Sequence, residues 1–130
     1  MELLVPTSAG ELIDKITILA LKAEKIADPE RLANVRHEAA RLEEVEAGLP
    51  AHPELAAMKA ELAEINARLW QIEDDIRARE AAGDFGADFI ALARAVYRTN
   101  DLRAAVKKRI NLALGSAIVE EKSYTDPGPA

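Results

Sequence analysis

The feature that most constrains this chain is a ladder of apolar residues spaced alternately three and four positions apart. Its members are Leu55, Met58, Leu62, Ile65, Leu69, Ile72 and Ile76. Because this spacing keeps one seam of an α-helix turned toward a partner helix, it is typical of coiled coils. The ladder predicts a helix over about residues 54–82, roughly 40 Å long at about 1.5 Å per residue, that packs along another helix.

Capping signals place three further helices. Ser8 and Glu11 have the spacing of a capping box, so a helix should begin at Ser8. Asp28 followed by Pro29 should end that helix and begin the next, since the first helical position tolerates proline. Gly115 is a natural left-handed cap for the last helix. The predicted helices cover about residues 8–27, 29–47, 54–82 and 88–114.

The connectors predict how these helices pair. The segment Gly48–Pro53 is short, so it should reverse the chain between the second and third helices. We therefore expect an all-α fold, an antiparallel bundle of four helices in which the second and third form a long coiled-coil-like helical hairpin. Short extended apolar termini should pack against the first and last helices. Residues 1–125 should form a single helical domain, and residues 126–130 a disordered tail.

Composition narrows the class of protein. Hydrophobic residues make up 49% of the 130 residues, charged residues 31% and aromatic residues only 4%, a balance typical of packed amphipathic helices. The net charge of −6 argues against nucleic-acid binding, which needs a basic surface. Cysteine is absent, nothing resembles a signal peptide, and no apolar run reaches the roughly 18 residues needed to span a bilayer. We expect a soluble cytoplasmic protein that binds neither membranes nor nucleic acid.

Polar side chains enter the inner face of the last predicted helix. Four of them share its apolar face on a helical wheel: Asn100, Arg103, Lys107 and Asn111. Buried cations must be paired or hydrogen-bonded, and the candidate partners on the preceding helix are Glu73 and Glu80. The set is either an internal salt-bridge network or a polar cleft for an anionic small molecule. In the second case all five residues, Glu73 included, would be ligand-binding residues.

Three apolar residues are candidates for an interface. Ile18 and Leu21 project opposite the main apolar face of the first helix, so that helix is either central in its bundle or covered by another subunit. Trp70 lies about 120° from the centre of the ladder, which suits either a binding role or a second packing layer. If these residues form an interface, the chain is a homo-oligomer, for which a dimer is the simplest form.

Motifs for catalysis or for cofactor binding do not stand out. The chain has no cysteine and no Gly-x-Ser-x-Gly elbow, so nothing identifies a catalytic nucleophile. His37 and His52 lie on different elements without metal-binding spacing, and no glycine-rich phosphate loop occurs. The catalytic residues are therefore unknown if any exist, and we expect no metal and no cofactor.

Four stretches together resemble a known family. They are residues 10–19 (GELIDKITIL), 69–74 (LWQIED), 96–103 (VYRTNDLR) and 110–124 (from Ile-Asn through Gly-Ser to Glu-Glu-Lys-Ser-Tyr). They are similar to a family of short bacterial helical proteins that is a domain of unknown function. The resemblance implies that the family pattern includes Trp70, Glu73, Asn100, Asp101, Arg103, Asn111 and the Glu-Glu-Lys-Ser-Tyr segment. It implies no activity.

Two functional hypotheses follow. The first is a non-enzymatic interaction or accessory protein that acts through its helix surfaces. The second is a binding protein or an enzyme for an anionic small molecule, built on the polar face of the last helix together with Glu73.

Overall fold

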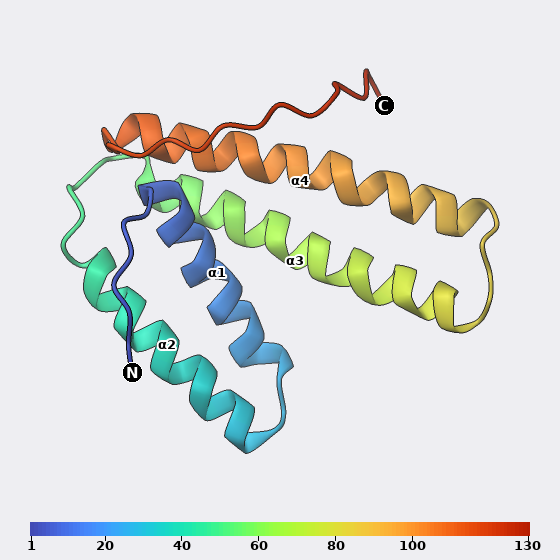
Figure 1. Cartoon of the computed structure of the whole chain (residues 1–130), viewed down its shortest axis with the longest axis horizontal. Helices are drawn as coiled ribbons and strands as arrows, with labels where there is room; N and C mark the ends of the chain where they lie inside the picture. Colours follow the sequence, from blue (N-terminus) through green and yellow to red (C-terminus); the bar gives the residue numbers. More distant parts are fainter.

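The chain folds into four helices and no strands, as the sequence predicts. The structure, a computed structural model, describes residues 1–130 (Figure 1). Its helices are α1 (Ala9–Lys25), α2 (Pro29–Glu46), α3 (Leu55–Ala81) and α4 (Ala87–Ala113). None of the four combines the length and the apolarity that a membrane crossing requires.

The helix ends follow the capping signals of the sequence. The Ser8 hydroxyl oxygen accepts a hydrogen bond from the backbone N–H of Glu11 at 3.1 Å, which satisfies a free donor of the first turn of α1. Asp28 does the same for α2 by accepting from the N–H of Arg31 at 2.9 Å. After α4 the chain turns at Gly115, whose φ of 64° lies in the left-handed region that glycine adopts without strain.

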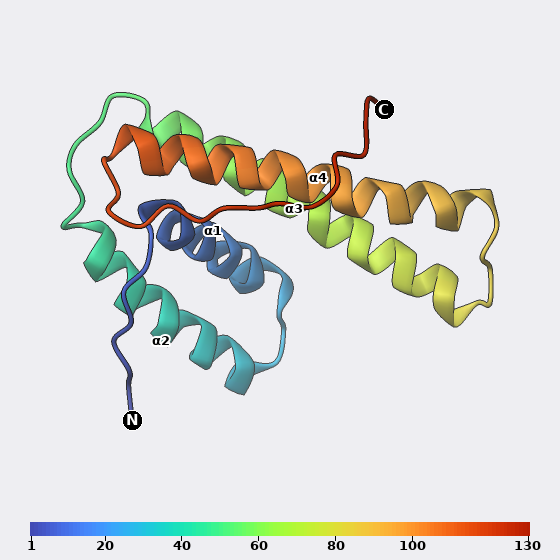
Figure 2. The ribbon, with the colours of Figure 1, turned by 45° about the horizontal axis from the view of Figure 1, so that its top comes forward.

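The pairing of the helices differs from the sequence prediction. α3 packs along α4, and α2 packs on α1, whereas the backbones of α2 and α3 do not approach each other (Figures 1 and 2). An ion pair of 2.7 Å from Lys59 to Glu46 links these two helices through side chains alone. The predicted hairpin of the second and third helices is therefore wrong, and the long hairpin is formed by α3 and α4.

The length and burial of the helices explain this pairing. α3 and α4 each have 27 residues and are joined by the short segment 82–86, so they can pair over their whole length. α2 has 18 residues, and Val35 is its one buried side chain. α4 offers the ladder two fully buried β-branched residues, Val106 and Ile110. The ladder of α3 therefore buries more apolar surface against α4 than it could bury against α2.

The core lies where α1 crosses one half of the α3–α4 hairpin. It consists of Ile13 of α1, Met58, Leu62, Ile65 and Leu69 of α3, and Val106 and Ile110 of α4. α1 contacts all three other helices, so its two apolar faces reflect a central position in the bundle. The other half of the hairpin extends beyond α1 and α2 (Figure 1), and residues 70–98 contain no fully buried side chain.

The two ends of the chain are extended. Residues 114–130 run back along α4, where Lys122 pairs with Asp101 at 2.5 Å and Arg98 donates to the carbonyl oxygen of Gly128 at 3.0 Å (Figures 1 and 2). Residues 1–7 form an arm whose apolar side chains are exposed, and the expectation that they pack against the first helix is wrong. The division into a domain of residues 1–125 and a disordered tail stays a prediction.

Candidate functional site

α1 and α4 meet at Gly10, where the two backbones come unusually close. A Cβ atom at this position would lie 2.4 Å from the carbonyl oxygen of Lys107, so any other side chain would push the helices apart. The N–H of Gly10 donates to Oδ1 of Asn111 at 2.6 Å, and the carbonyl oxygen of Asn111 accepts from the N–H of Ser116 at 2.8 Å. Asn111 is almost fully buried. It therefore joins α1, α4 and the C-terminal segment.

Next to this joint, Asp14 and Arg103 form a buried ion pair. Asp14 has no exposed surface, and its two carboxylate oxygens accept from Nε and Nη2 of Arg103 at 2.9 and 2.5 Å. Nδ2 of Asn66 donates to Asp14 Oδ1 and to Thr17 Oγ1, both at 2.9 Å, and the Thr17 hydroxyl donates to the backbone carbonyl oxygen of Asp14 at 2.8 Å. The hydrogen bond to Asp14 raises the pKa of Arg103. The Asp14 carboxylate, which would be too costly to bury unpaired, thus has a hydrogen-bonded cation and an amide donor as partners.

Lys107 extends the network to the C-terminal segment. Its ammonium lies 2.6 Å from Glu11 Oε2, 3.5 Å from Glu120 Oε2 and 3.9 Å from Asp14 Oδ2. Burial by itself would lower the pKa of Lys107, but the hydrogen bond to Glu11 and the charges around it raise it. The Ser8 hydroxyl donates to Glu120, and this hydrogen bond lowers the pKa of Glu120. The start of α1 is thereby tied to the segment after α4.

The observed partner of Arg103 differs from the one inferred from the sequence. The carboxylate is that of Asp14, whereas Glu73 pairs with Arg77 at 3.3 Å and is half exposed. Every buried polar side-chain atom of the protein has a hydrogen-bond partner, so the polar face of α4 is largely an internal salt-bridge network. The signal that could have revealed Asp14 is its place among the apolar residues at 12, 13, 16 and 19.

Two concave surfaces lie on either side of Arg103 and Asn100. The first, which we name the recess, lies between α1, α3 and α4 and has a volume of about 400 Å³. It is lined by Ile18, Leu21, Asn66, Leu69, Trp70, Glu73, Asp74, Asn100 and Arg103. The recess therefore brings the three predicted interface residues together with three of the five predicted ligand-binding residues.

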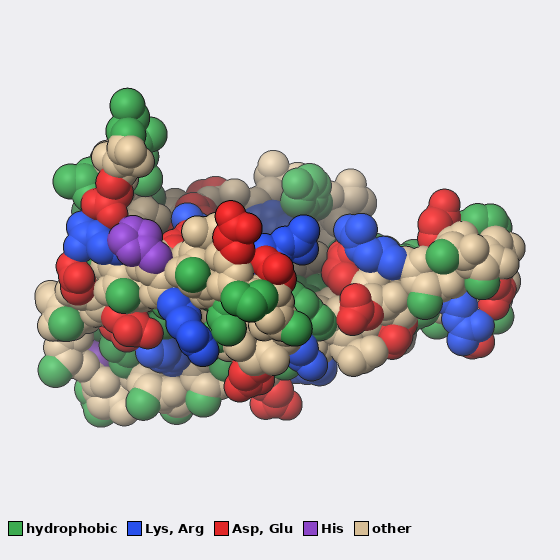
Figure 3. Space-filling model, turned by 90° about the horizontal axis from the view of Figure 1, so that it is seen from below, with side chains coloured by type: hydrophobic (Ala, Val, Ile, Leu, Met, Phe, Trp, Pro, Cys, Tyr) green, Lys and Arg blue, Asp and Glu red, His purple; other side chains and the backbone are tan.

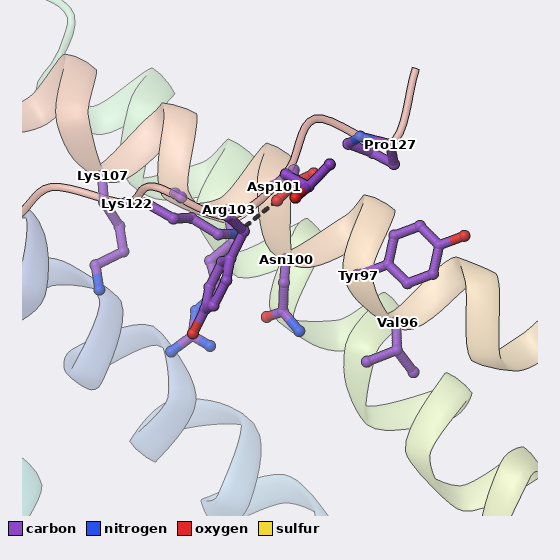
Figure 4. A pocket seen from close by; sticks show the side chains of 11 residues that line it. Val96, Tyr97, Asn100, Asp101, Arg103, Lys107, Lys122 and Pro127 are labelled. Carbon is purple, nitrogen blue, oxygen red and sulfur yellow. Dashed lines mark hydrogen bonds and ion pairs between the residues drawn. The ribbon is translucent and has the colours of Figure 1, made fainter. Parts of the chain in front are cut away.

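The second concavity, the tail cavity, has a volume of about 440 Å³ and lies between α4 and the C-terminal segment. Asn100, Arg103 and Lys107 line it together with Lys122 and Tyr124. Figure 4 shows Arg103 and Lys107 projecting from α4 toward α1. Asn111 lines neither concavity, so the structure separates it from the other predicted ligand-binding residues. No three histidine, aspartate or glutamate side chains are grouped so as to hold a metal ion.

Comparison with known proteins identifies the family of the chain. Residues 3–130 match the model of a family of unknown function (DUF6165). The chain belongs to this family. The predicted membership in a family of unknown function is thereby confirmed, and the match includes every residue of the network and of both concavities. No curated protein and no solved structure matches the chain.

Proposed function

We propose that this chain is a non-enzymatic interaction protein whose binding element is the N-terminal arm, residues 1–7. The observation that carries the proposal is the exposure of four large apolar side chains, which ranges from 74% to 114% for Met1, Leu3, Leu4 and Val5. Figure 3 shows the arm standing clear of the body, with hydrophobic side chains uncovered. Covering such a side chain is worth about 1.5–3 kcal/mol. An arm of this kind therefore favours a bound state.

The contacts of the arm suggest a second copy of the chain as its partner. No backbone hydrogen bond involves residues 1–7, and the arm is held to α2 by the bidentate pair of Glu2 with Arg41, at 2.8 and 2.9 Å. Between the arm and α2 lies a trough of about 470 Å³ whose walls include Leu12, Leu42 and Val45. The arm of another copy could make the same ion pair and fill this trough, which is the usual low-cost route to an exchanged dimer.

Charge reversal can distinguish an arm-exchanged dimer from an arm that stays on its own chain. The Glu2→Arg and Arg41→Glu variants should each dimerise poorly, because each places like charges at both arm contacts of its homodimer. In an equimolar mixture, both arm contacts of the mixed dimer again join opposite charges. Sedimentation velocity should therefore show dimer in the mixture and monomer in the separate samples. A mixture that sediments like its separate components would contradict the proposal.

The apolar contribution is tested separately. Replacing Leu3 and Leu4 with aspartate should weaken dimerisation by at least about tenfold, given the free energy of burying each side chain. Leu112→Asp is the matched control, because Leu112 is also exposed but lies on α4 away from the trough. A wild-type chain that remains monomeric at all concentrations, or an equal effect of the control, would refute the role of the arm.

The alternative function, binding of an anionic small molecule at the polar face of α4, has less support. Arg103 and Lys107 are already paired with carboxylates of α1, and Asn111 is buried in the joint with Gly10. A simple anion would have to displace these partners.

A further inference from the structure

Several polar groups that line the recess are not used by the fold. Asp14 engages Nε and Nη2 of Arg103, which leaves Nη1 without a partner in the protein. The side-chain amide of Asn100 makes no hydrogen bond within the protein. The Nδ2 of Asn66 donates to two partners, whereas its Oδ1 accepts from none and is the polar atom through which this largely buried residue reaches the surface. The recess therefore offers free donors and a free acceptor held in place by buried side chains.

The charges around the recess select against a simple anion. Arg103 is neutralised by Asp14, and Glu73 pairs with Arg77. Asp74 also lines the recess and forms no ion pair, so the local charge is negative overall. A ligand that uses the guanidinium should therefore also carry a positive group.

The remaining walls of the recess are apolar. Ile18 and Leu21 of α1 face the recess together with Leu69 and Trp70 of α3. A volume of about 400 Å³ is at the small end of the range for ligand sites. These walls suit one apolar side chain of modest size.

We propose that the recess binds a free α-amino acid with an apolar side chain. Its carboxylate would accept hydrogen bonds from Nη1 of Arg103 and from the amide of Asn100. Its ammonium would lie against Oδ1 of Asn66, and the negative charge of Asp74 farther along α3 would favour a cation in the recess. Its side chain would pack on Leu21 and Trp70. This site is independent of the N-terminal arm, so either proposal can fail without the other.

Trp70 provides a direct readout, because it is the only tryptophan of the chain. L-leucine has no aromatic ring, so titrating the full chain with it should give a saturable change in Trp70 fluorescence, with a dissociation constant in the millimolar range or below. Saturation-transfer NMR on leucine provides a second measurement that does not depend on the indole. Absence of both signals would refute the site.

Two analogues test the zwitterion. 4-Methylpentanoate lacks the ammonium group and 3-methylbutylamine lacks the carboxylate, so each should bind at least about tenfold more weakly than leucine, as expected for a lost charge-assisted hydrogen bond. Equal binding of either analogue would contradict the assigned contacts.

A matched pair of variants tests the location. Asn100→Ala removes a side chain that makes no hydrogen bond in the fold, so the protein should keep its melting temperature and lose about tenfold in affinity for leucine. Asn34→Ala is the control, because Asn34 is exposed on α2 and lies outside the recess. Equal affinities of the two variants would overturn the assignment.

Discussion

Replacing Arg103 with methionine should destabilise the fold strongly, because it leaves Asp14 buried without its cation. Removing one partner of a buried ion pair costs about 3–5 kcal/mol. The Arg103 side chain is 29% exposed, and Asn66 still donates to Asp14, so we expect the lower end, about 3 kcal/mol. A domain of this size is stable by about 5–15 kcal/mol in total. The loss should be evident as a lower midpoint in urea unfolding followed by circular dichroism.

Two further variants make this prediction specific. Arg77→Met breaks the exposed pair with Glu73 and should cost at most about 1 kcal/mol. Combining Arg103→Met with Asp14→Leu removes both charges, so the double variant should be more stable than the sum of the two single losses implies. An equal loss of stability in Arg103→Met and Arg77→Met would contradict this prediction, and so would simple additivity of the losses at Asp14 and Arg103.

Two other substitutions probe the joint between α1, α4 and the C-terminal segment. Gly10→Ala should lower the free energy of unfolding by about 1–3 kcal/mol, because the added Cβ would lie 2.4 Å from the carbonyl oxygen of Lys107; this clash outweighs the better helix propensity of alanine. Gly48→Ala is the control and should be nearly neutral, since its Cβ meets only ordinary contacts. An equal loss of stability at both positions would contradict the steric argument. The hydrogen bond from the Ser8 hydroxyl lowers the pKa of Glu120 in the folded state. Ionised Glu120 therefore stabilises the fold above the ordinary glutamate pKa of 4.5, and this stabilisation is lost as the pH falls through the lowered pKa of the folded state. Urea unfolding should show Glu120→Gln less stable than wild type by less than about 1 kcal/mol at neutral pH, with the difference vanishing in acid; a difference that persists there would refute the linkage.

The number and the ends of the helices could be predicted because their causes are local. A cap acts through the hydrogen bond of Ser8 or Asp28 to a backbone N–H three residues later, and proline at position 29 acts through its own φ angle. Such signals lie within one turn of the chain, so they can be read without knowing the fold.

The polar site could be predicted only in part from such local signals. The helical wheel placed Arg103 and Lys107 on an inner face correctly, because that face depends on one helix alone. Their carboxylate partners lie on α1, and Asp14 is separated from Arg103 by 89 positions. No spacing rule links residues so far apart, so the sequence alone points to the nearer Glu73.

The sequence by itself determined that the chain forms four amphipathic helices, where they begin and end, and that one of them needs a long apolar partner. Only the tertiary structure decided that this partner is α4, that α1 lies at the centre of the bundle, and that Asp14 and Arg103 meet. The physical reason is that an apolar stripe specifies burial without specifying what covers it. Which helix covers it depends on the total burial and the hydrogen bonds of the whole packing, including the close contact that Gly10 allows with α4.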